Sequence, residues 1–138
     1  MGCNLSTAPT THAHATAREI RLLCRGGAWD GPTAGAALGF TQVNLVVLRS
    51  AFAADFEKFC RLNPQPCPLL EVTSPGSYEP HRMAPGADLR TDLPRYRVLQ
   101  NGDCVDRPAS IERYWRDDFV AFLVGCSFTF ELTRRICE

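Results

Sequence analysis

The sequence has no excess of either charge and no long apolar run. Its 138 residues include 15 lysines and arginines against 15 aspartates and glutamates, so the formal net charge is zero. A protein that binds nucleic acid usually shows a basic face in its composition, so we expect no nucleic-acid partner. No apolar run approaches the roughly 20 residues needed to span a bilayer, so we expect no stable membrane association. The 45% hydrophobic content indicates a globular protein of one ordinary domain.

The cysteines also match no known metal or disulfide pattern. Seven are present, which is an odd number, and neither a C-x-x-C pair nor the Cys/His spacing of a zinc site occurs. The first 25 residues lack the continuous apolar stretch of a secretory signal. We therefore expect reduced thiols in a cytoplasmic protein, and no metal ion.

The first six residues, Met1 to Ser6, match the pattern for N-myristoylation, with Cys3 available for a second acyl chain. Short patterns of this kind often occur by chance. An N-acylated form at a membrane, or a mitochondrial location, is therefore kept as the alternative to the cytoplasm. Residues 1–15 are expected to form a flexible tail.

Hydrophobic periodicity and turn residues predict both helices and strands. We expect helices over 16–25 and 50–62, strands over 42–48 and 69–72, a β-hairpin over 96–106 around Asn101-Gly102, and a helix from Ser110 through Cys126. The strand at 42–48 is nearly all apolar, so we expect it to be buried on both faces. The aromatic stripe of the helix at 50–62, formed by Phe52, Phe56 and Phe59, is expected to belong to the core.

The polar stretch over 84–97 has a proline near each end. Pro85-Gly86 predicts a turn at its start, and the second proline stops any helix near its end. Asp88, Arg90 and Asp92 therefore lie on an irregular segment with fixed ends, as the polar groups of a small-ligand site often do. The alternative is a solvated loop braced by local Asp–Arg pairs, which contribute little to stability.

Gln42 and Asn44 stand at the start of the strand at 42–48 and have the same period-2 phase, so they point to one face. They either satisfy neighbouring backbone groups or reach a ligand site, and the sequence favours neither role.

Several strings in the sequence, taken together and in this order, resemble one known family. They are 31–35 (GPTAG), 42–48 (QVNLVVL), 63–72 (NPQPCPLLEV), 84–98 (APGADLRTDLPRYRV) and 115–128 (WRDDFVAFLVGCSF). The family is that of the D-glutamate cyclase-like putative hydro-lyases, and the strings cover most of residues 18–131.

This resemblance implies an α/β fold, which we expect to contain a mixed sheet with flanking helices. It also implies a lyase that removes water, and the best-supported activity in the family is the closure of D-glutamate to 5-oxo-D-proline. The chain resembles the N-terminal half of the family over 16–131. Its last residues, 132–138, do not resemble the family's continuation.

Cyclisation of glutamate requires the α-amine to attack the γ-carboxyl carbon while water leaves. A general base, hydrogen-bond donors for the oxyanion and a cation for the other carboxylate would serve this reaction, and no cofactor is required. We expect Arg90 to bind a substrate carboxylate through its two-pronged guanidinium. The other expected substrate-binding residues are Thr91, Asn44 and Gln42.

The expected catalytic residues are Asp92 and Asp88, as base or amine anchor, and Cys126 and Ser127, as hydrogen-bond donors. The alternative for each residue is a structural role. The alternative for the whole chain is a non-catalytic half that binds a small carboxylate or a partner chain, and a homo-oligomer is kept open.

Overall fold

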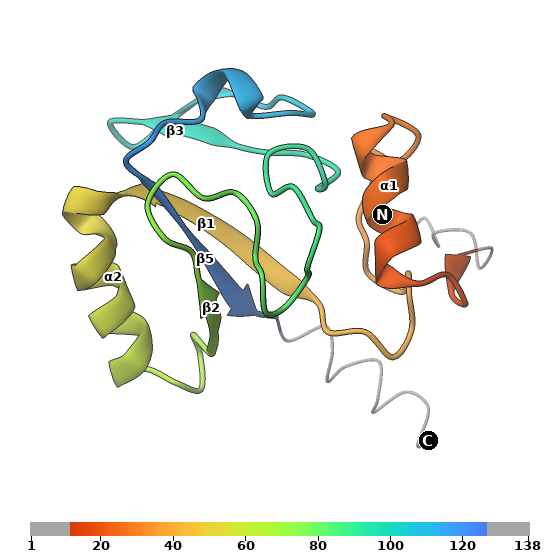
Figure 1. The fold of residues 1–138 in the computed structure, drawn as a ribbon, viewed down its shortest axis with the longest axis horizontal. Coiled ribbons are helices and arrows are strands. Elements are labelled where there is room, and N and C mark those ends of the chain that lie inside the picture. The colour runs from red at the N-terminus through yellow and green to blue at the C-terminus, as the bar shows by residue number, and fades with distance from the viewer. Residues whose placement is uncertain (1–11, 127–138) are drawn as a thin grey trace, which may run out of the picture.

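The computed structural model of the chain describes residues 12–126 (Figure 1). Its elements are, in chain order, α1 (Ala17–Arg25), β1 (Val43–Arg49), α2 (Ser50–Leu62), β2 (Leu69–Val72), β3 (Val98–Gln100), β4 (Asp103–Asp106), the 3-10 helix η2 (Glu112–Tyr114) and β5 (Phe119–Gly125). The expected α/β combination of a sheet and flanking helices is confirmed. Every strand pair in the described part is antiparallel, so no parallel pair makes the sheet a mixed one there. Within residues 12–126, no helix is long and apolar enough to cross a membrane.

The last strand, β5, is the centre of the main sheet, whose order is β1-β5-β2. It pairs with β1 along its whole length, from Gly125 opposite Val43 to Phe119 opposite Arg49. All its residues from Val120 to Val124 are buried. The strand therefore joins two segments that lie far from it in the sequence.

The helix predicted from Ser110 through Cys126 is wrong. The chain forms only the short turn η2, where the Ser110 hydroxyl accepts a 3.3 Å hydrogen bond from the N–H of Glu112, and it then becomes the strand β5. A continuous apolar run of this length fits a buried strand and a buried helix equally well by periodicity. The strand is favoured here because it gives hydrogen-bond partners to two neighbouring strands and buries both of its faces.

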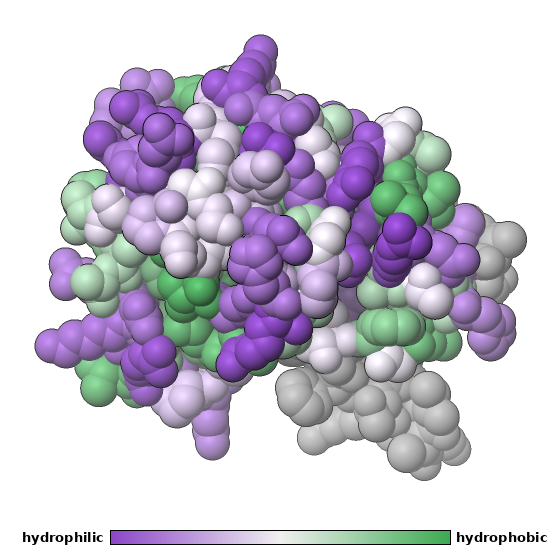
Figure 2. Space-filling view, in the orientation of Figure 1, coloured by the Kyte–Doolittle hydropathy of each residue, from purple (hydrophilic) through white to green (hydrophobic). Residues whose placement is uncertain are grey.

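One face of the sheet is covered by α2 (Figure 1). The ring of Phe56 meets the ring of Phe122 edge-on, with 4.9 Å between the centroids, and Cys60 is 1% exposed. The predicted aromatic core stripe is only partly correct, because Phe52 and Phe59 are 61% and 53% exposed. The helix is rotated so that Phe56 and Cys60 meet the sheet, and this leaves apolar side chains at the surface over α2 (Figure 2).

The opposite face of the sheet packs against the loop over 84–97. Ala121 and Leu123 of β5 contact Leu89 and Leu93 of this loop. Side chains alternate between the two faces along a strand, so Val120, Phe122 and Val124 of β5 lie on the face covered by α2, and Ala121 and Leu123 lie on the face covered by the loop over 84–97.

The strand β1 lies at the edge of the sheet, so the prediction that it is buried on both faces is wrong. This strand was expected to be buried on both faces, but its residues are half-buried or exposed, and Val43 and Asn44 are among the exposed ones. The reason is that β5 takes the central place, so β1 has a strand on one side only.

The helix α1 lies apart from the sheet and packs against the glycine-rich loop over 31–40 (Figure 1). The predicted helix is confirmed: Thr16 and Glu19 form a reciprocal capping box at its start. Its apolar side forms a small core of its own with the loop, made of Ile20, Cys24, Ala36 and Ala37.

The predicted hairpin is confirmed as β3 and β4. Asn101 and Gly102 both have positive φ, at 52° and 89°, which is the backbone that a tight two-residue hairpin turn requires.

Replacing Phe122 with Ala should lower the free energy of unfolding by about 3–5 kcal/mol, because the side chain is fully buried and its loss leaves a cavity under α2. Denaturant unfolding followed by circular dichroism measures the change. The control is Leu99→Ala on the hairpin, where the side chain is 64% exposed and the change should stay within about 0.5 kcal/mol. Equal losses in the two variants would contradict the central position of β5.

Candidate functional site

The loop over 84–97 is fixed at its start and across its middle. The predicted turn at Pro85-Gly86 is present, closed by a 3.0 Å backbone hydrogen bond, with a φ of 77° at the glycine. The buried hydroxyl of Tyr96 donates to the carbonyl of Leu89 at 2.8 Å and accepts from the N–H of Leu93 at 3.3 Å. Burial raises the pKa of Tyr96, so its hydroxyl keeps the proton that it donates.

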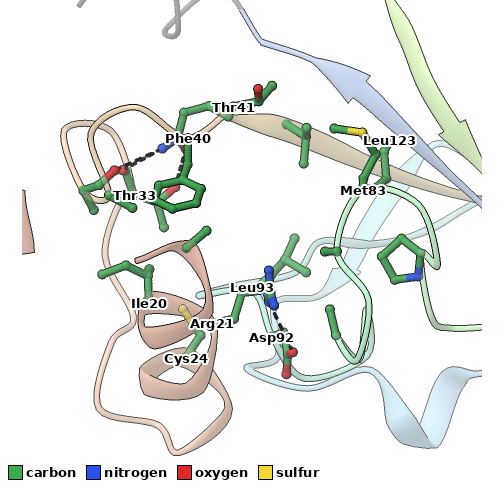
Figure 3. A pocket seen from close by; sticks show the side chains of 18 of the residues that line it. Ile20, Arg21, Cys24, Thr33, Phe40, Thr41, Met83, Asp92, Leu93 and Leu123 are labelled. Carbon is green, nitrogen blue, oxygen red and sulfur yellow. Dashed lines mark hydrogen bonds and ion pairs between the residues drawn. The ribbon is translucent and has the colours of Figure 1, made fainter. Parts of the chain in front are cut away.

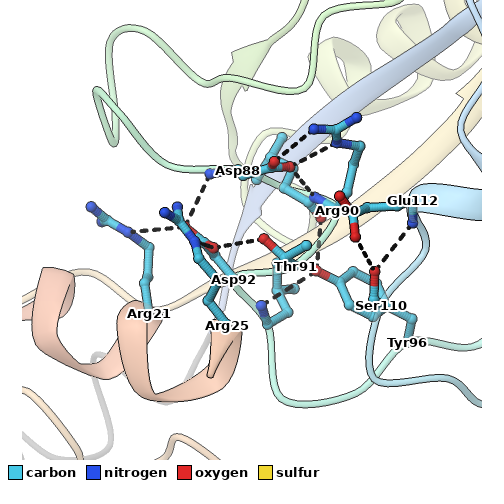
Figure 4. A network of polar contacts seen from close by, with 11 residues as sticks. Arg21, Arg25, Asp88, Arg90, Thr91, Asp92, Tyr96, Ser110 and Glu112 are labelled. Carbon is cyan, nitrogen blue, oxygen red and sulfur yellow. Dashed lines mark hydrogen bonds and ion pairs between the residues drawn. The ribbon is translucent and has the colours of Figure 1, made fainter. Parts of the chain in front are cut away.

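The carboxylate of Asp92 connects this loop to α1 (Figure 4). Its side chain is 2% exposed, and Arg25 holds it with two hydrogen bonds, Nε to Oδ1 at 2.6 Å and Nη2 to Oδ2 at 2.7 Å. It also accepts from the hydroxyl of Thr91 at 2.9 Å and from the backbone N–H of Asp88 at 3.0 Å. These hydrogen bonds offset the cost of burying the charge.

Arg90 pairs with Asp88. Its Nε and Nη2 donate to the two carboxylate oxygens at 2.9 and 2.8 Å, and its guanidinium carbon lies 3.5 Å from the ring centroid of Tyr78. Burial disfavours the charged form of Asp88, but the hydrogen bonds from Arg90 outweigh burial and lower the pKa of this carboxyl. A carboxylate with a lowered pKa is a weak base, so this pair fits the bracing role that the sequence left open.

A cavity of about 390 Å³ lies between α1, the glycine-rich loop and the loop over 84–97 (Figure 3). Most of its lining is apolar, with Ile20 from α1, Leu89 and Leu93 from the polar loop, and Leu123 from β5. The nitrogen- and oxygen-bearing side chains in the lining are those of Arg21, Asp92, Thr33, Thr41 and Gln42.

Arg21 reaches from α1 toward Asp92 at the wall of this cavity (Figure 3). Its Nε is 4.0 Å from Oδ2 of Asp92, which is too long for a hydrogen bond, and the Nε is buried without a partner among the described residues. A buried donor without an acceptor costs about 1–3 kcal/mol. The cavity wall therefore holds a charged donor that a ligand oxygen could satisfy.

The predicted site residues fall into three groups. Asp92 and Gln42 line the cavity, whereas Asp88, Arg90 and Thr91 belong to the polar network behind Asp92 (Figure 4). The third group, Asn44 and Cys126, lies along the β1–β5 pair.

Gln42 and Cys126 are brought together at the end of the β1–β5 pair, where the N–H of Cys126 donates to the carbonyl of Gln42 at 3.3 Å. The amide of Gln42 also bonds to the glycine-rich loop, accepting from the Thr33 hydroxyl at 3.1 Å and donating to a carbonyl at 3.3 Å. Asn44 is exposed, two residues further along β1. Ser127 lies outside the described residues.

Cys24 is the thiol that lines the cavity. Burial and then the charge of Asp92 raise the pKa of this thiol to about 11, so it is a poor nucleophile near neutral pH. The cysteines in the described part of the chain are free. Among residues 12–126, no group of three or more His, Cys, Asp and Glu side chains is placed to hold a metal ion.

Sequence patterns did not single out the two arginines of α1 that face the site. Arg21 and Arg25 are spaced i, i+4, next to the apolar side that Ile20 and Cys24 form. Residues at this spacing share a helix side, so a pair of basic residues bordering an apolar stripe was the available signal. Their partner, 67 positions away from Arg25, could not be read from local spacing.

The chain is similar to proteins named putative hydro-lyase. The protein of Stutzerimonas stutzeri is 52% identical over 122 residues, which are 88% of this chain and 46% of the relative. The protein of Geobacillus kaustophilus is also 52% identical over 122 residues, with the same shares. The protein of Rubrobacter xylanophilus is 58% identical over 115 residues, which are 83% of this chain and 44% of the relative. The chain thus spans less than half the length of these curated relatives and matches their N-terminal half, while no family model matches it.

Replacing Asp92 with Asn should lower the free energy of unfolding by about 1–3 kcal/mol, because the buried pair with Arg25 is broken while the guanidinium can still turn to water. Thermal or denaturant unfolding measures the loss. The matched control is Asp30→Asn, since the Asp30–Arg95 pair, at 3.3 Å, is exposed on both sides and should contribute little. A D92N variant as stable as D30N would contradict the role of Asp92.

Acid should destabilise the chain partly through Asp88. The folded-state pKa of this carboxyl is below its unfolded value, so its stabilisation is present above about pH 4 and is lost as the pH falls through the folded-state pKa. We expect Asp88→Asn to be less stable at pH 7 and to show a shallower fall in unfolding free energy below pH 4. Parallel acid profiles of the two proteins would rule this out.

Proposed function

We propose that this chain, which matches the N-terminal half of the hydro-lyase family, forms the part of a hydro-lyase that holds a small carboxylate substrate. The observation that carries the proposal is the cavity between α1 and the loop over 84–97. It combines an apolar enclosure with a few polar groups, which is the usual composition of a small-molecule site.

The proposed reaction is the closure of D-glutamate, or a similar small amino acid, to its lactam. The α-nitrogen of D-glutamate forms a bond to the γ-carboxyl carbon, one γ-oxygen leaves as water, and the products are 5-oxo-D-proline and water. The ammonium group must lose one proton before it attacks and a second proton once the new bond has formed, and both protons leave with the departing oxygen as water. The enzyme must therefore place an amine, a carboxyl carbon and a proton acceptor within reach of one another.

The roles expected for the individual residues are part of this proposal. Asp92 lines the cavity and keeps the role of amine anchor in this proposal, in which the ammonium group shares its carboxylate with Arg25. Asp88 is less suited to be the base, since its carboxylate is held by Arg90 and does not line the cavity. Gln42 is placed to donate to a ligand only by giving up a bond to the glycine-rich loop.

The other expected residues lie further from the cavity. Arg90 and Thr91 would support the loop from behind, Asn44 and Cys126 lie at the β1–β5 edge, and Ser127 remains an expected donor outside the described residues.

A second candidate is a carboxylate-binding half without turnover. It is favoured by the exposed apolar side of α2, where Phe52 and Phe59 are 61% and 53% exposed and could contact a partner chain. In this case the cavity would bind the ligand, and a partner chain would supply further catalytic groups.

Excess D-glutamate should raise the thermal midpoint of the purified chain, because a ligand that binds only the folded state stabilises it by mass action. 4-Aminobutanoate, which is glutamate without its α-carboxylate, is the matched control and should give a smaller shift. Release of 5-oxo-D-proline, followed by proton NMR, then separates the two candidates. A shift with product supports the lyase, a shift without product supports the binding half, and the absence of any shift contradicts both.

A further inference from the structure

The polar network beside the cavity contains three guanidinium groups, and only one of them makes no hydrogen bond to the described residues. Arg25 is engaged by the carboxylate of Asp92, and Arg90 is engaged by the carboxylate of Asp88. The guanidinium of Arg21 makes no hydrogen bond within residues 12–126, and its Nε lies 4.0 Å from Oδ2 of Asp92. Its side chain is 24% exposed and contributes to the cavity wall.

The charges at this wall are also uneven. The cavity lining contains one arginine, Arg21, and one carboxylate, Asp92. The carboxylate is already matched by Arg25, which holds both of its oxygens. The cavity therefore faces one positive charge in excess, and in a partly buried place such a charge is screened less than at the surface.

We infer that Arg21 is the residue that binds the ligand's carboxylate, and that the ligand carries one carboxylate on a compact, weakly polar body. This inference rests on the proposed function and makes it more specific. The lining supports the second half of the statement, because Ile20, Leu89, Leu93 and Leu123 would surround a body of low polarity. A single guanidinium without hydrogen bonds to the described residues matches a single carboxylate.

The proposed reaction distinguishes the two carboxylates of the substrate. Lactam formation consumes the amine and the γ-carboxylate, whereas the α-carboxylate is unchanged. Arg21 therefore binds the α-carboxylate, which is present in both substrate and product. The product has one charge and a neutral ring, so it fits the one-arginine cavity better than glutamate with its three charged groups.

Arg90 is the rival for this role, as the sequence suggested. To bind a ligand it would have to leave two hydrogen bonds to Asp88 and its contact with the Tyr78 ring. Arg21 has no such bonds to break. The assignment therefore moves from the arginine of the loop to an arginine of α1.

The test uses a pair of probes that differ only in the charged group, cyclopentanecarboxylate and cyclopentanecarboxamide, together with 5-oxo-D-proline. Isothermal titration measures their binding to the full chain, to Arg21→Gln and to Arg18→Gln. Arg18 is an exposed residue of the same helix outside the cavity lining, so it controls for the loss of one positive charge. Arg21→Lys is the second variant, and thermal unfolding of each variant shows that it is folded.

We expect the wild-type chain and R18Q to bind the carboxylate at least about tenfold more tightly than the carboxamide, which corresponds to about 1.4 kcal/mol. R21Q should lose this preference, and R21K should keep only part of it, because a point charge replaces a fork. Binding of 5-oxo-D-proline should weaken in parallel.

Two results would overturn the inference. If R21Q keeps the preference for the carboxylate, another residue binds it, although the cavity still binds carboxylates. If the wild-type chain does not distinguish carboxylate from carboxamide, no residue of the cavity acts in this way. A preference that depends on Arg21, combined with no response to D-glutamate in the thermal assay, would instead leave the inference standing and remove the proposed substrate.

Discussion

The buried carboxylate of Asp92 holds the first helix against the rest of the molecule. Removing a charged group from water costs several kcal/mol unless hydrogen bonds replace the lost hydration. Here the replacement comes from two directions, since Arg25 donates from α1 while Thr91 and the backbone of Asp88 donate from the loop itself. One side chain thus fixes the conformation of the loop and the position of the helix together.

This arrangement also explains why the cavity lies where it does. The helix α1 and the glycine-rich loop pack into one small core, and the sheet with its covering loop forms another. The two cores meet along polar contacts, and the space between them is lined by both. Arg25 is the nearer arginine and binds Asp92, so Arg21, one helical turn earlier, is left facing this space. The closest ion pair of the site and the arginine without hydrogen bonds to the described residues are therefore consequences of the same geometry.

Local signals in the sequence predicted those elements that local interactions determine. The capping box of α1, the Asn101-Gly102 hairpin and the Pro85-Gly86 turn are each specified by residues within a few positions of one another. The strand β5 was mistaken for a helix because a short apolar run carries no clear period, and its true partners lie in β1 and β2.

In the candidate site, too, local contacts could be predicted from the sequence and long-range contacts could not. The sequence identified the polar loop, but it could not show which arginine meets which carboxylate. The local pair, Arg90 with Asp88, spans two positions, whereas Arg25 and Asp92 are 67 positions apart. The exposed side of α2 was likewise unpredictable, because a broad aromatic stripe does not show which of its edges will face a sheet.

The central place of β5 couples the site to the closure of the sheet. The residues of β1 pair with residues of β5 that lie 70 to 82 positions later in the chain, so this pairing has a high entropic cost of loop closure. The polar loop packs its Leu89 and Leu93 on β5 residues that are buried only once that pairing exists. Asp92 belongs to the same loop segment as these two leucines and pairs with Arg25 of α1, so the position of its carboxylate depends on how the loop packs. The cavity is thus a product of long-range assembly, and the arginine that faces it acquires its environment only when the sheet, the loop and the first helix are all in place.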